Sequence, residues 1–195
     1  VGHATTAYYV GYLGFGSLRY SGLNEKQSVL LGSLASWLFL TTVETFDGFS
    51  KHWGASATDM VANTFGCGLF AGQQLLWHDQ RIKLKWSYHQ TDFAHYRPDL
   101  LGETFAEKML KDYNGQTYWL SLNIKSFLTK NSNFPAWLNV SLGYGAEGMT
   151  GASVNSMTYL GNEIPAFDRR RQFYLGPDID LSRIKTRSVL LKGLF

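Results

Sequence analysis

A chain of 195 residues is long enough to bury a hydrophobic core, as one domain or as a helical half followed by a smaller β half. Charged residues make up only 17% of it, against roughly 25% in ordinary soluble domains, so part of the surface is expected to face a partner protein or a membrane. The net charge of +3, with no basic tract beyond Arg169–Arg171, argues against a nucleic-acid partner, and the single cysteine excludes an intrachain disulfide.

The first half of the chain is expected to be helical. Aromatic and aliphatic residues at helical spacing predict a helix over His3–Ser21, with Gly22 as its C-cap. Asn24–Gln27 resembles a capping box, so a second helix is expected over Glu25–Phe46. Gly48 is expected to end this second helix.

A third helix completes a predicted bundle over residues 1–78. Ser56 has N-cap spacing to Asp59, which predicts a helix that ends near Trp77. Short turns between three adjacent helices predict an antiparallel arrangement. The uncharged runs Ser28–Val43 and Met60–Trp77 fall at or below the roughly 17–25 residues that cross a bilayer, and polar residues interrupt them. A buried bundle is therefore favoured, and a membrane span is the lesser alternative.

Residues 79–195 are expected to form a small antiparallel β region with long loops, packed on the bundle as one unit. Alternation of apolar and polar residues predicts a strand over Ile82–Trp86 with one solvent-facing side. Further strands are expected at Tyr118–Ile124, at Trp137–Tyr144 and, last, at Arg171–Leu175. The predicted fold class is α+β.

Other segments of this half are expected to be short helices and loops. A short helix is predicted near Thr104–Asp112, and Gly143–Gly151 is predicted to be a mobile glycine-rich loop. Ser182–Leu194 is expected to be a terminal helix or a docking tail. Within the strand at Trp137–Tyr144, period-two alternation places four residues on one side: Leu138, Val140, Leu142 and Tyr144.

Acidic side chains and one carboxamide stand among apolar residues near the second interhelical turn. Because an unpaired buried carboxylate is costly, these groups need partners such as His3, Lys51 or His52. Spacings of three and four residues place them in pairs on shared helix faces. A structural polar network is favoured, and a divalent metal site and acid–base catalysis are the alternatives. The predicted cluster contains His3, Glu44, Asp47, Asp59 and Asn63.

The sequence carries no recognisable catalytic motif. It has no GxxxxGKS phosphate loop, no GxSxG and no HExxH. Cys67 lies in an apolar helix without a nearby cue for a lowered pKa, so a buried and inert thiol is expected. The sequence therefore predicts a non-enzymatic protein with no catalytic residue, no resident metal and no cofactor.

Exposed Tyr, Trp and Arg side chains in the second half are expected to serve a protein interface, since interfaces are enriched in these residues. The alternative for the arginines is a plain solvated surface, and for YNGQTYW a turn that enters a strand. The predicted partner-binding residues are Tyr113, Tyr118, Trp119, Tyr144, Met149, Arg169, Arg170 and Arg171.

Several segments, spread over essentially the whole chain, carry a family resemblance: Gly2–Ala4, Glu44–Ser50, Trp53–Ser56, Asp59, Ala62–Asn63, Leu76–Trp77, Lys111–Leu120, Gly143–Met149 and Tyr174–Ile184. Through them the chain resembles the YfiM-like periplasmic lipoprotein family (DUF2279) in its Bacteroidota form, with KDYNGQTYWL at Lys111–Leu120 as the most specific segment. In that family an Asp-Lys pair usually precedes the Gly-His and more chain follows, so the sequence is expected to be trimmed at both ends.

The resemblance implies a periplasmic protein associated with the outer membrane. The chain is also similar to the small periplasmic plug subunit of the type 9 secretion translocon, which closes the inner mouth of a large outer-membrane pore. The implied partner is an outer-membrane β-barrel or this translocon, and peripheral membrane association is a further expectation. The order His, Glu, Asp, Asp, Asn also resembles that of VanZ-like membrane proteins. It implies, as the alternative, a metal- or lipid-handling envelope protein that uses the His/Glu/Asp cluster.

Overall fold

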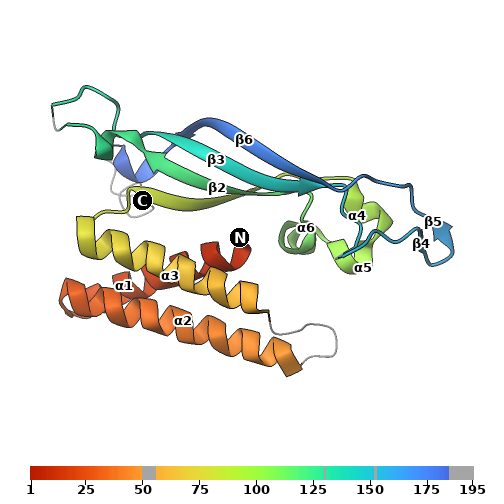
Figure 1. Ribbon diagram of the computed structural model, residues 1–195, viewed down its shortest axis with the longest axis horizontal. Helices are drawn as coiled ribbons and strands as arrows, with labels where there is room; N and C mark the ends of the chain where they lie inside the picture. The colour runs from red at the N-terminus through yellow and green to blue at the C-terminus, as the bar shows by residue number, and fades with distance from the viewer. Residues whose placement is uncertain (50–55, 130, 152, 185–195) are drawn as a thin grey trace. The chain divides into compact units, whose positions relative to one another are not determined.

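The computed structural model has two compact units, Val1–Leu84 and Lys85–Phe195, and each is described by itself. It describes residues 1–49, 56–129, 131–151 and 153–184. Helices come first and antiparallel strands follow, which confirms the α+β class (Figure 1). The boundary between the units falls inside the first strand, a few residues after the predicted boundary at 78/79. The packing of residues 79–195 on the bundle as one unit stays a prediction.

Three helices build the first unit: α1 (Gly2–Tyr20), α2 (Glu25–Phe49) and α3 (Ala57–Trp77). α1 and α3 run in the same direction, and α2 runs against both (Figure 1). Each helix packs on the other two. The predicted antiparallel three-helix bundle is therefore confirmed, and α1 and α3 begin at the end of the bundle where α2 ends.

The helix ends follow the predicted capping signals, with one exception. After α1, Gly22 has φ +95° and its N–H donates to the carbonyl of Arg19 at 3.1 Å, as in a Schellman turn. Asn24 Oδ1 accepts from the N–H of Gln27 at 2.9 Å and caps α2. The prediction that Gly48 ends α2 is wrong, since the helix continues through it. A single glycine costs a helix about 1 kcal/mol and does not end it by itself.

Close contact between α1 and α3 depends on a glycine. A Cβ added at Gly66 would lie 2.1 Å from the carbonyl oxygen of Ala4 and 2.8 Å from Cβ of Ala7. Beside this contact, the buried side chains of Ala7, Leu40 and Cys67 form a small apolar core. Cys67 is buried as predicted, and burial raises the pKa of its thiol.

The outward side of α2 is apolar. Its exposed residues, here named the α2 apolar face, are Leu30, Leu31, Leu34, Leu38 and Phe39, each 47–59% exposed. By length and composition Glu25–Phe46 is the one helix in the described residues that could cross a membrane, and 28% of its most apolar window is buried. The expectation of a buried apolar run is wrong for this face. Small and polar side chains fill much of the space between the helices, among them Ser28, Ser36 and Asn63, all 0% exposed.

Four strands form the main sheet, in the order β1 (Ile82–Tyr88), β2 (Gln116–Asn123), β3 (Leu138–Glu147) and β6 (Arg170–Ile179). β3 pairs antiparallel with both β2 and β6. A separate hairpin consists of β4 (Thr158–Tyr159) and β5 (Asn162–Glu163). β6 is therefore an edge strand of the main sheet.

Two predictions for these strands are wrong. The first part of Gly143–Gly151, predicted to be a loop, belongs to β3, where a Cβ added at Gly143 would lie 2.7 Å from the ring of Trp119. This glycine leaves room for the neighbouring indole, so its role is to allow packing within the sheet and not to make a loop mobile. The last strand does not end at Leu175 but continues through Pro177. Proline is tolerated there because an edge strand lacks a neighbour on one side.

Short helices fill the connections. They are α4 (Phe93–Tyr96), α5 (Pro98–Leu101), α6 (Phe105–Lys111) and two 3-10 turns, η1 (Ile124–Phe127) and η2 (Leu181–Arg183). α6 confirms the helix predicted near Thr104–Asp112, and the Thr104 side chain accepts from the N–H of Glu107 as its N-cap. The predicted tail Ser182–Leu194 starts in η2, and from residue 185 it lies outside the described residues.

One side of the β3–β6 pair is apolar and exposed. The register pairs Leu142 with Leu175 and Tyr144 with Phe173, so the side predicted for Leu138–Tyr144 is confirmed and continues onto β6. Leu142 is 53% exposed, Leu175 73% and Phe173 76%. We name this surface the apolar sheet face. It consists of Val140, Leu142, Tyr144, Phe173, Leu175 and Ile179.

Candidate functional site

Three predicted cluster residues meet where three helix ends come together. His3 is the second residue of α1, Glu44 lies near the end of α2, and Asp59 lies in the first turn of α3. Because α1 and α3 start where α2 stops, these positions are neighbours in space although the sequence separates them (Figure 1). We name them the His3 triad.

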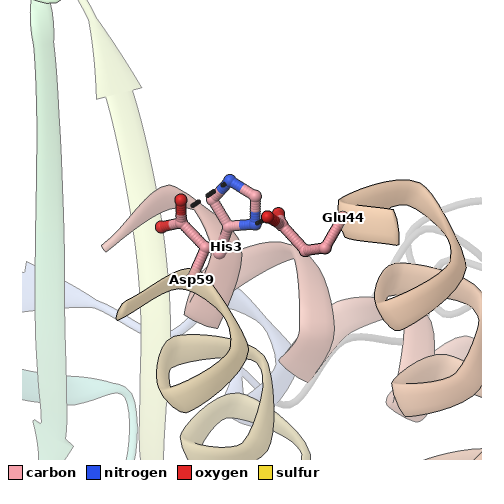
Figure 2. A group of neighbouring side chains, drawn as sticks. All are labelled: His3, Glu44 and Asp59. Atoms are coloured by element: carbon pink, nitrogen blue, oxygen red, sulfur yellow. Dashed lines mark ion pairs between the residues drawn. The ribbon is translucent and has the colours of Figure 1, made fainter. Parts of the chain in front are cut away.

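The imidazole of His3 lies between the two carboxylates, as Figure 2 shows. Its Nδ1 atom is 3.1 Å from Oε1 of Glu44, and its Nε2 atom is 3.9 Å from Oδ1 of Asp59. The side chain of Glu44 is only 5% exposed, while those of His3 and Asp59 are 39% and 36% exposed. The triad is therefore closed on the Glu44 side and open to solvent on the other.

The fourth predicted member, Asn63, lies one helical turn after Asp59 on α3. Its side chain is fully buried at 0% exposure. Neither Oδ1 nor Nδ2 has a hydrogen-bond partner among the residues that the structure describes. Buried amides are nearly always hydrogen-bonded in folded proteins, so this group stands out.

The remaining candidates fall outside what the structure describes. Asp47 lies on α2, but its side chain is not described. Lys51 and His52 belong to residues 50–55, which also lie outside the described residues. The contact of His3 with both carboxylates is thus observed, and countercharge from His3, Lys51 or His52 stays a prediction.

The triad has two chemical interpretations. As an ion-pair bridge, His3 links both carboxylates and ties three helix ends together. Asp59 also stands next to the capped start of α3, where its N–H donates to Oγ of Ser56 at 3.3 Å and its charge suits the helix dipole. As a ligand set, one imidazole nitrogen and two carboxylate oxygens suit a divalent transition metal. One such atom from each residue lies within 4.8 Å of the other two.

The predicted partner-binding residues do not form one surface. Tyr118 pairs with Tyr144 across β2 and β3, which places both on the side of the apolar sheet face, and Trp119 therefore points to the opposite side. There its Nε1–H donates to Oγ of Ser87 at 2.8 Å. Burial raises the pKa of Tyr118. Tyr113 and the arginines are exposed and Met149 is half-buried; the arginines are Arg169, Arg170 and Arg171.

The segment KDYNGQTYWL is mainly structural. Asn114 is buried, and its Nδ2 donates to Oδ1 of Asp112 at 2.8 Å and to the carbonyl of Met149 at 2.9 Å. Its Oδ1 accepts from the N–H of Met149 at 2.7 Å. Gln116 Nε2 donates to the carbonyls of α6 residues Met109 and Leu110. The most specific segment of the chain thus joins α6, β2 and the end of β3.

Sequence reasoning missed a polar network on the opposite side of the sheet. Asp178 Oδ2 accepts from Nζ of Lys85 at 2.6 Å and from Oγ of Ser121 at 2.5 Å. Asn139 Nδ2 donates to Ser121 Oγ, and Asn123 Nδ2 donates to Asn139 Oδ1 at 2.6 Å. Burial raises the pKa of Asp178, but the hydrogen bonds from Lys85 and Ser121 outweigh it, so the pKa lies below its ordinary value. Alternating Ser and Asn in both strands was the available signal.

A second missed network lies at the other end of the bundle. Tyr8 donates its hydroxyl to Oε1 of Gln80 at 3.1 Å, and Gln80 Nε2 donates to Oε1 of Gln74 at 3.0 Å. Gln74 in turn donates to Oε1 of Glu25 at 2.7 Å, which also lies 3.1 Å from Nδ1 of His78. The Gln pair that interrupts the apolar run of α3 was its sequence signal.

Comparison with known proteins finds a family match for the helical part of the chain. No curated protein and no solved structure matches the chain. One family model matches residues 1–73, which include the whole His3 triad and Asn63. Its description, predicted periplasmic lipoprotein (DUF2279), supports a periplasmic location for this protein.

Proposed function

We propose that this protein is a non-enzymatic periplasmic component that docks on an outer-membrane β-barrel protein. We further propose that the barrel is the type 9 secretion translocon, whose periplasmic mouth the protein plugs. The observation that carries the docking proposal is the apolar sheet face. Its members Leu142, Phe173 and Leu175 are each more than half exposed in the part of the chain that the structure describes.

An uncovered apolar face of this kind favours an interface. Soluble monomers rarely expose contiguous apolar patches larger than about a few hundred Å². Patches above that size mark contacts with a protein or a membrane. Among the described residues the face ends in β6, an edge strand, and edge strands suit pairing with a strand of another chain. Exposed arginines, Arg169–Arg171, stand at the start of this strand and favour an acidic rim on the partner.

The periplasmic description of the matching family supports the compartment. The choice of barrel rests on the resemblance of the sequence to the plug subunit. The absence of a recognisable catalytic motif from the sequence supports a non-enzymatic role. In this proposal the bundle is a scaffold held by its internal polar groups, and the sheet meets the partner.

Affinity purification from gently solubilised outer membranes tests the proposal. The tagged protein should retain a large β-barrel, recognised by its heat-dependent migration on gels and identified by mass spectrometry. Leu142→Glu and Phe173→Glu should abolish this retention, because each places a charge in the apolar contact. Recovery of the wild-type protein alone and monomeric would refute docking, and recovery of a barrel other than the translocon would refute only the plug assignment.

A matched control separates docking from folding. Val154 is 79% exposed and lies outside the main sheet, so Val154→Glu makes the same apolar-to-acidic change away from the face. This variant should retain the barrel as the wild type does. All variants should keep the wild-type melting temperature, since the substituted side chains are exposed. If Val154→Glu fails to retain the barrel as well, the apolar sheet face is not the docking surface.

The α2 apolar face favours a second candidate, peripheral association with a lipid surface. Its leucines are about half exposed along a helix whose apolar window is 28% buried. Flotation with lipid vesicles tests it. The wild type should float, Leu34→Glu should not, and Phe173→Glu should float like the wild type. Failure of the wild type to float would end this candidate without affecting docking on the barrel.

A further inference from the structure

We propose that the His3 triad, together with Asn63, binds a single divalent transition-metal ion that joins the ends of α1, α2 and α3. The inference is independent of the docking proposal. It rests on two separate observations: the geometry of the triad and the unsatisfied amide of Asn63, one helical turn after Asp59.

The geometry brings a usable ligand set together. Zinc holds nitrogen and oxygen ligands at about 2.0–2.2 Å, so neighbouring ligand atoms in a tetrahedral site lie roughly 3.4 Å apart. In the triad the two carboxylates contact different ring nitrogens of His3, with Nδ1 at 3.1 Å from Glu44 and Nε2 at 3.9 Å from Asp59, and one ion binds only one of these nitrogens. One ligand atom per residue falls within 4.8 Å of the other two. Binding of one ion would require the partly exposed side chains of His3 and Asp59 to rotate until one ring nitrogen and both carboxylates face it.

The charge of the triad also fits. A metal binds the neutral form of imidazole and the ionised form of carboxylates, so the bound ligand set would carry two negative charges, and Glu44 is almost completely removed from water. Burying carboxylate charge is costly unless a cation compensates it. A divalent ion neutralises both charges, and the open side at His3 and Asp59 gives it a route from solvent.

Asn63 is the second observation. Its amide is fully buried, and neither of its polar atoms has a hydrogen-bond partner among the described residues. It shares a helix face with Asp59, four residues earlier. Side chains on a helix tilt toward its N-terminus, which for α3 is the end that holds the triad. In the proposed site the amide oxygen of Asn63 is therefore the candidate for a fourth ligand.

The nature of the ligands defines the class of ion. Imidazole nitrogen suits zinc, iron, nickel and copper, whereas sites for calcium and magnesium consist of oxygen ligands alone. Zinc binds His nitrogen and Asp or Glu oxygen, mostly in tetrahedral geometry. We therefore assign the site to a zinc-like divalent ion and use Zn²⁺ and Co²⁺ as probes.

Calorimetric titration of the chelator-treated protein with Zn²⁺ tests the site. The wild type should bind one equivalent, and Co²⁺ should give the visible absorption of a four-coordinate site. His3→Gln and Asp59→Asn should each weaken Zn²⁺ binding at least tenfold. Both side chains are more than a third exposed, so the variants should fold, and circular dichroism checks this.

His78 offers a matched control at the other end of the bundle. Its Nδ1 lies 3.1 Å from Oε1 of Glu25, the same distance as in the triad, but this pair is not part of a three-ligand group among the described residues. His78→Gln should therefore bind Zn²⁺ like the wild type. Zn²⁺ should raise the melting temperature of the wild type and of His78→Gln but not that of His3→Gln.

Asn63→Leu gives two effects of opposite sign. Without metal it should be at least as stable as the wild type, because an unpaired buried amide is replaced by an apolar group of similar size. Its affinity for Zn²⁺ should fall several-fold, because one ligand is lost. Unchanged affinity would remove Asn63 from the site. Absence of Zn²⁺ binding in the wild type, or wild-type affinity in His3→Gln, would overturn the metal site and leave an ion-pair bridge, with the docking proposal unaffected.

Discussion

Nδ1 of His3 lies 3.1 Å from Oε1 of Glu44, and this contact joins the first turn of α1 to the C-terminal part of α2. Glu44 is buried, so Glu44→Ala removes the inner partner of the contact and leaves a small void. We expect the free energy of unfolding to fall by about 2 kcal/mol in the absence of metal. Urea denaturation followed by tryptophan fluorescence measures it.

Glu163 is the control for this change, because it is exposed in the separate β4–β5 hairpin. Glu163→Ala should stay within about 0.5 kcal/mol of the wild type. If both variants unfold at the same urea concentration, Glu44 does not stabilise the bundle.

Two glycines of α3 should respond in opposite directions to alanine. A Cβ at Gly66 would meet the Ala4 carbonyl oxygen at 2.1 Å, whereas a Cβ at Gly68 meets nothing within 4 Å. Gly66→Ala should therefore lower the free energy of unfolding by about 2 kcal/mol through overpacking. Gly68→Ala should raise it by roughly 0.5–1 kcal/mol, because alanine favours the helix. Thermal unfolding distinguishes them, and stabilisation by both would contradict the α1–α3 contact.

Asn114 should be among the most sensitive positions of the second unit. Its amide pairs with both backbone groups of Met149, at 2.7 and 2.9 Å, and with Asp112. Asn114→Ala removes the amide and its hydrogen bonds to these partners, so the free energy of unfolding should fall by about 3 kcal/mol. The exposed Asn133→Ala should have little effect. Chemical denaturation of both variants provides the comparison, and an equally mild effect at Asn114 would count against a structural role.

The Asp178 network predicts a loss of stability in acid. Hydrogen bonds from Lys85 and Ser121 outweigh burial and hold the pKa of Asp178 below its ordinary value of 3.8. Folding therefore favours the ionised carboxylate. Its contribution is fully present above about pH 4, the unfolded pKa being about 3.9, and is lost as the pH falls through the lower folded pKa.

Asp178→Asn cannot titrate and should lack this component. We expect the variant to be less stable than the wild type at pH 6 and the difference to shrink as the pH falls below about 4. Urea denaturation at a series of pH values measures the difference. A difference in stability that is constant with pH would show that the charge of Asp178 does not contribute to stability.

Much of the fold could be predicted because its signals are local. Asn24 and Ser56 cap their helices as their side chains suggest, and alternation identified the apolar side of β3. The errors also have local causes. Gly48 and Gly143 have the residue type of a break, yet one lies within a helix and the other makes room for the ring of Trp119.

The site could be predicted only in part. The uncharged run Ser28–Val43 makes Glu44 stand out in the sequence. Its contact with His3 became visible only in the structure. The network of Asp178 was missed, since its members come from strands that are distant in sequence and adjacent only in the folded sheet.

By itself the sequence determined where helices and strands begin and which of their residues share a side, because those properties depend on neighbours along the chain. The tertiary structure alone decided which side is covered. It left Leu34 and Phe173 exposed, buried Asn63 without a described partner, and placed His3 between two carboxylates. These outcomes depend on how separate elements pack, and packing is set by contacts between residues that no local pattern links.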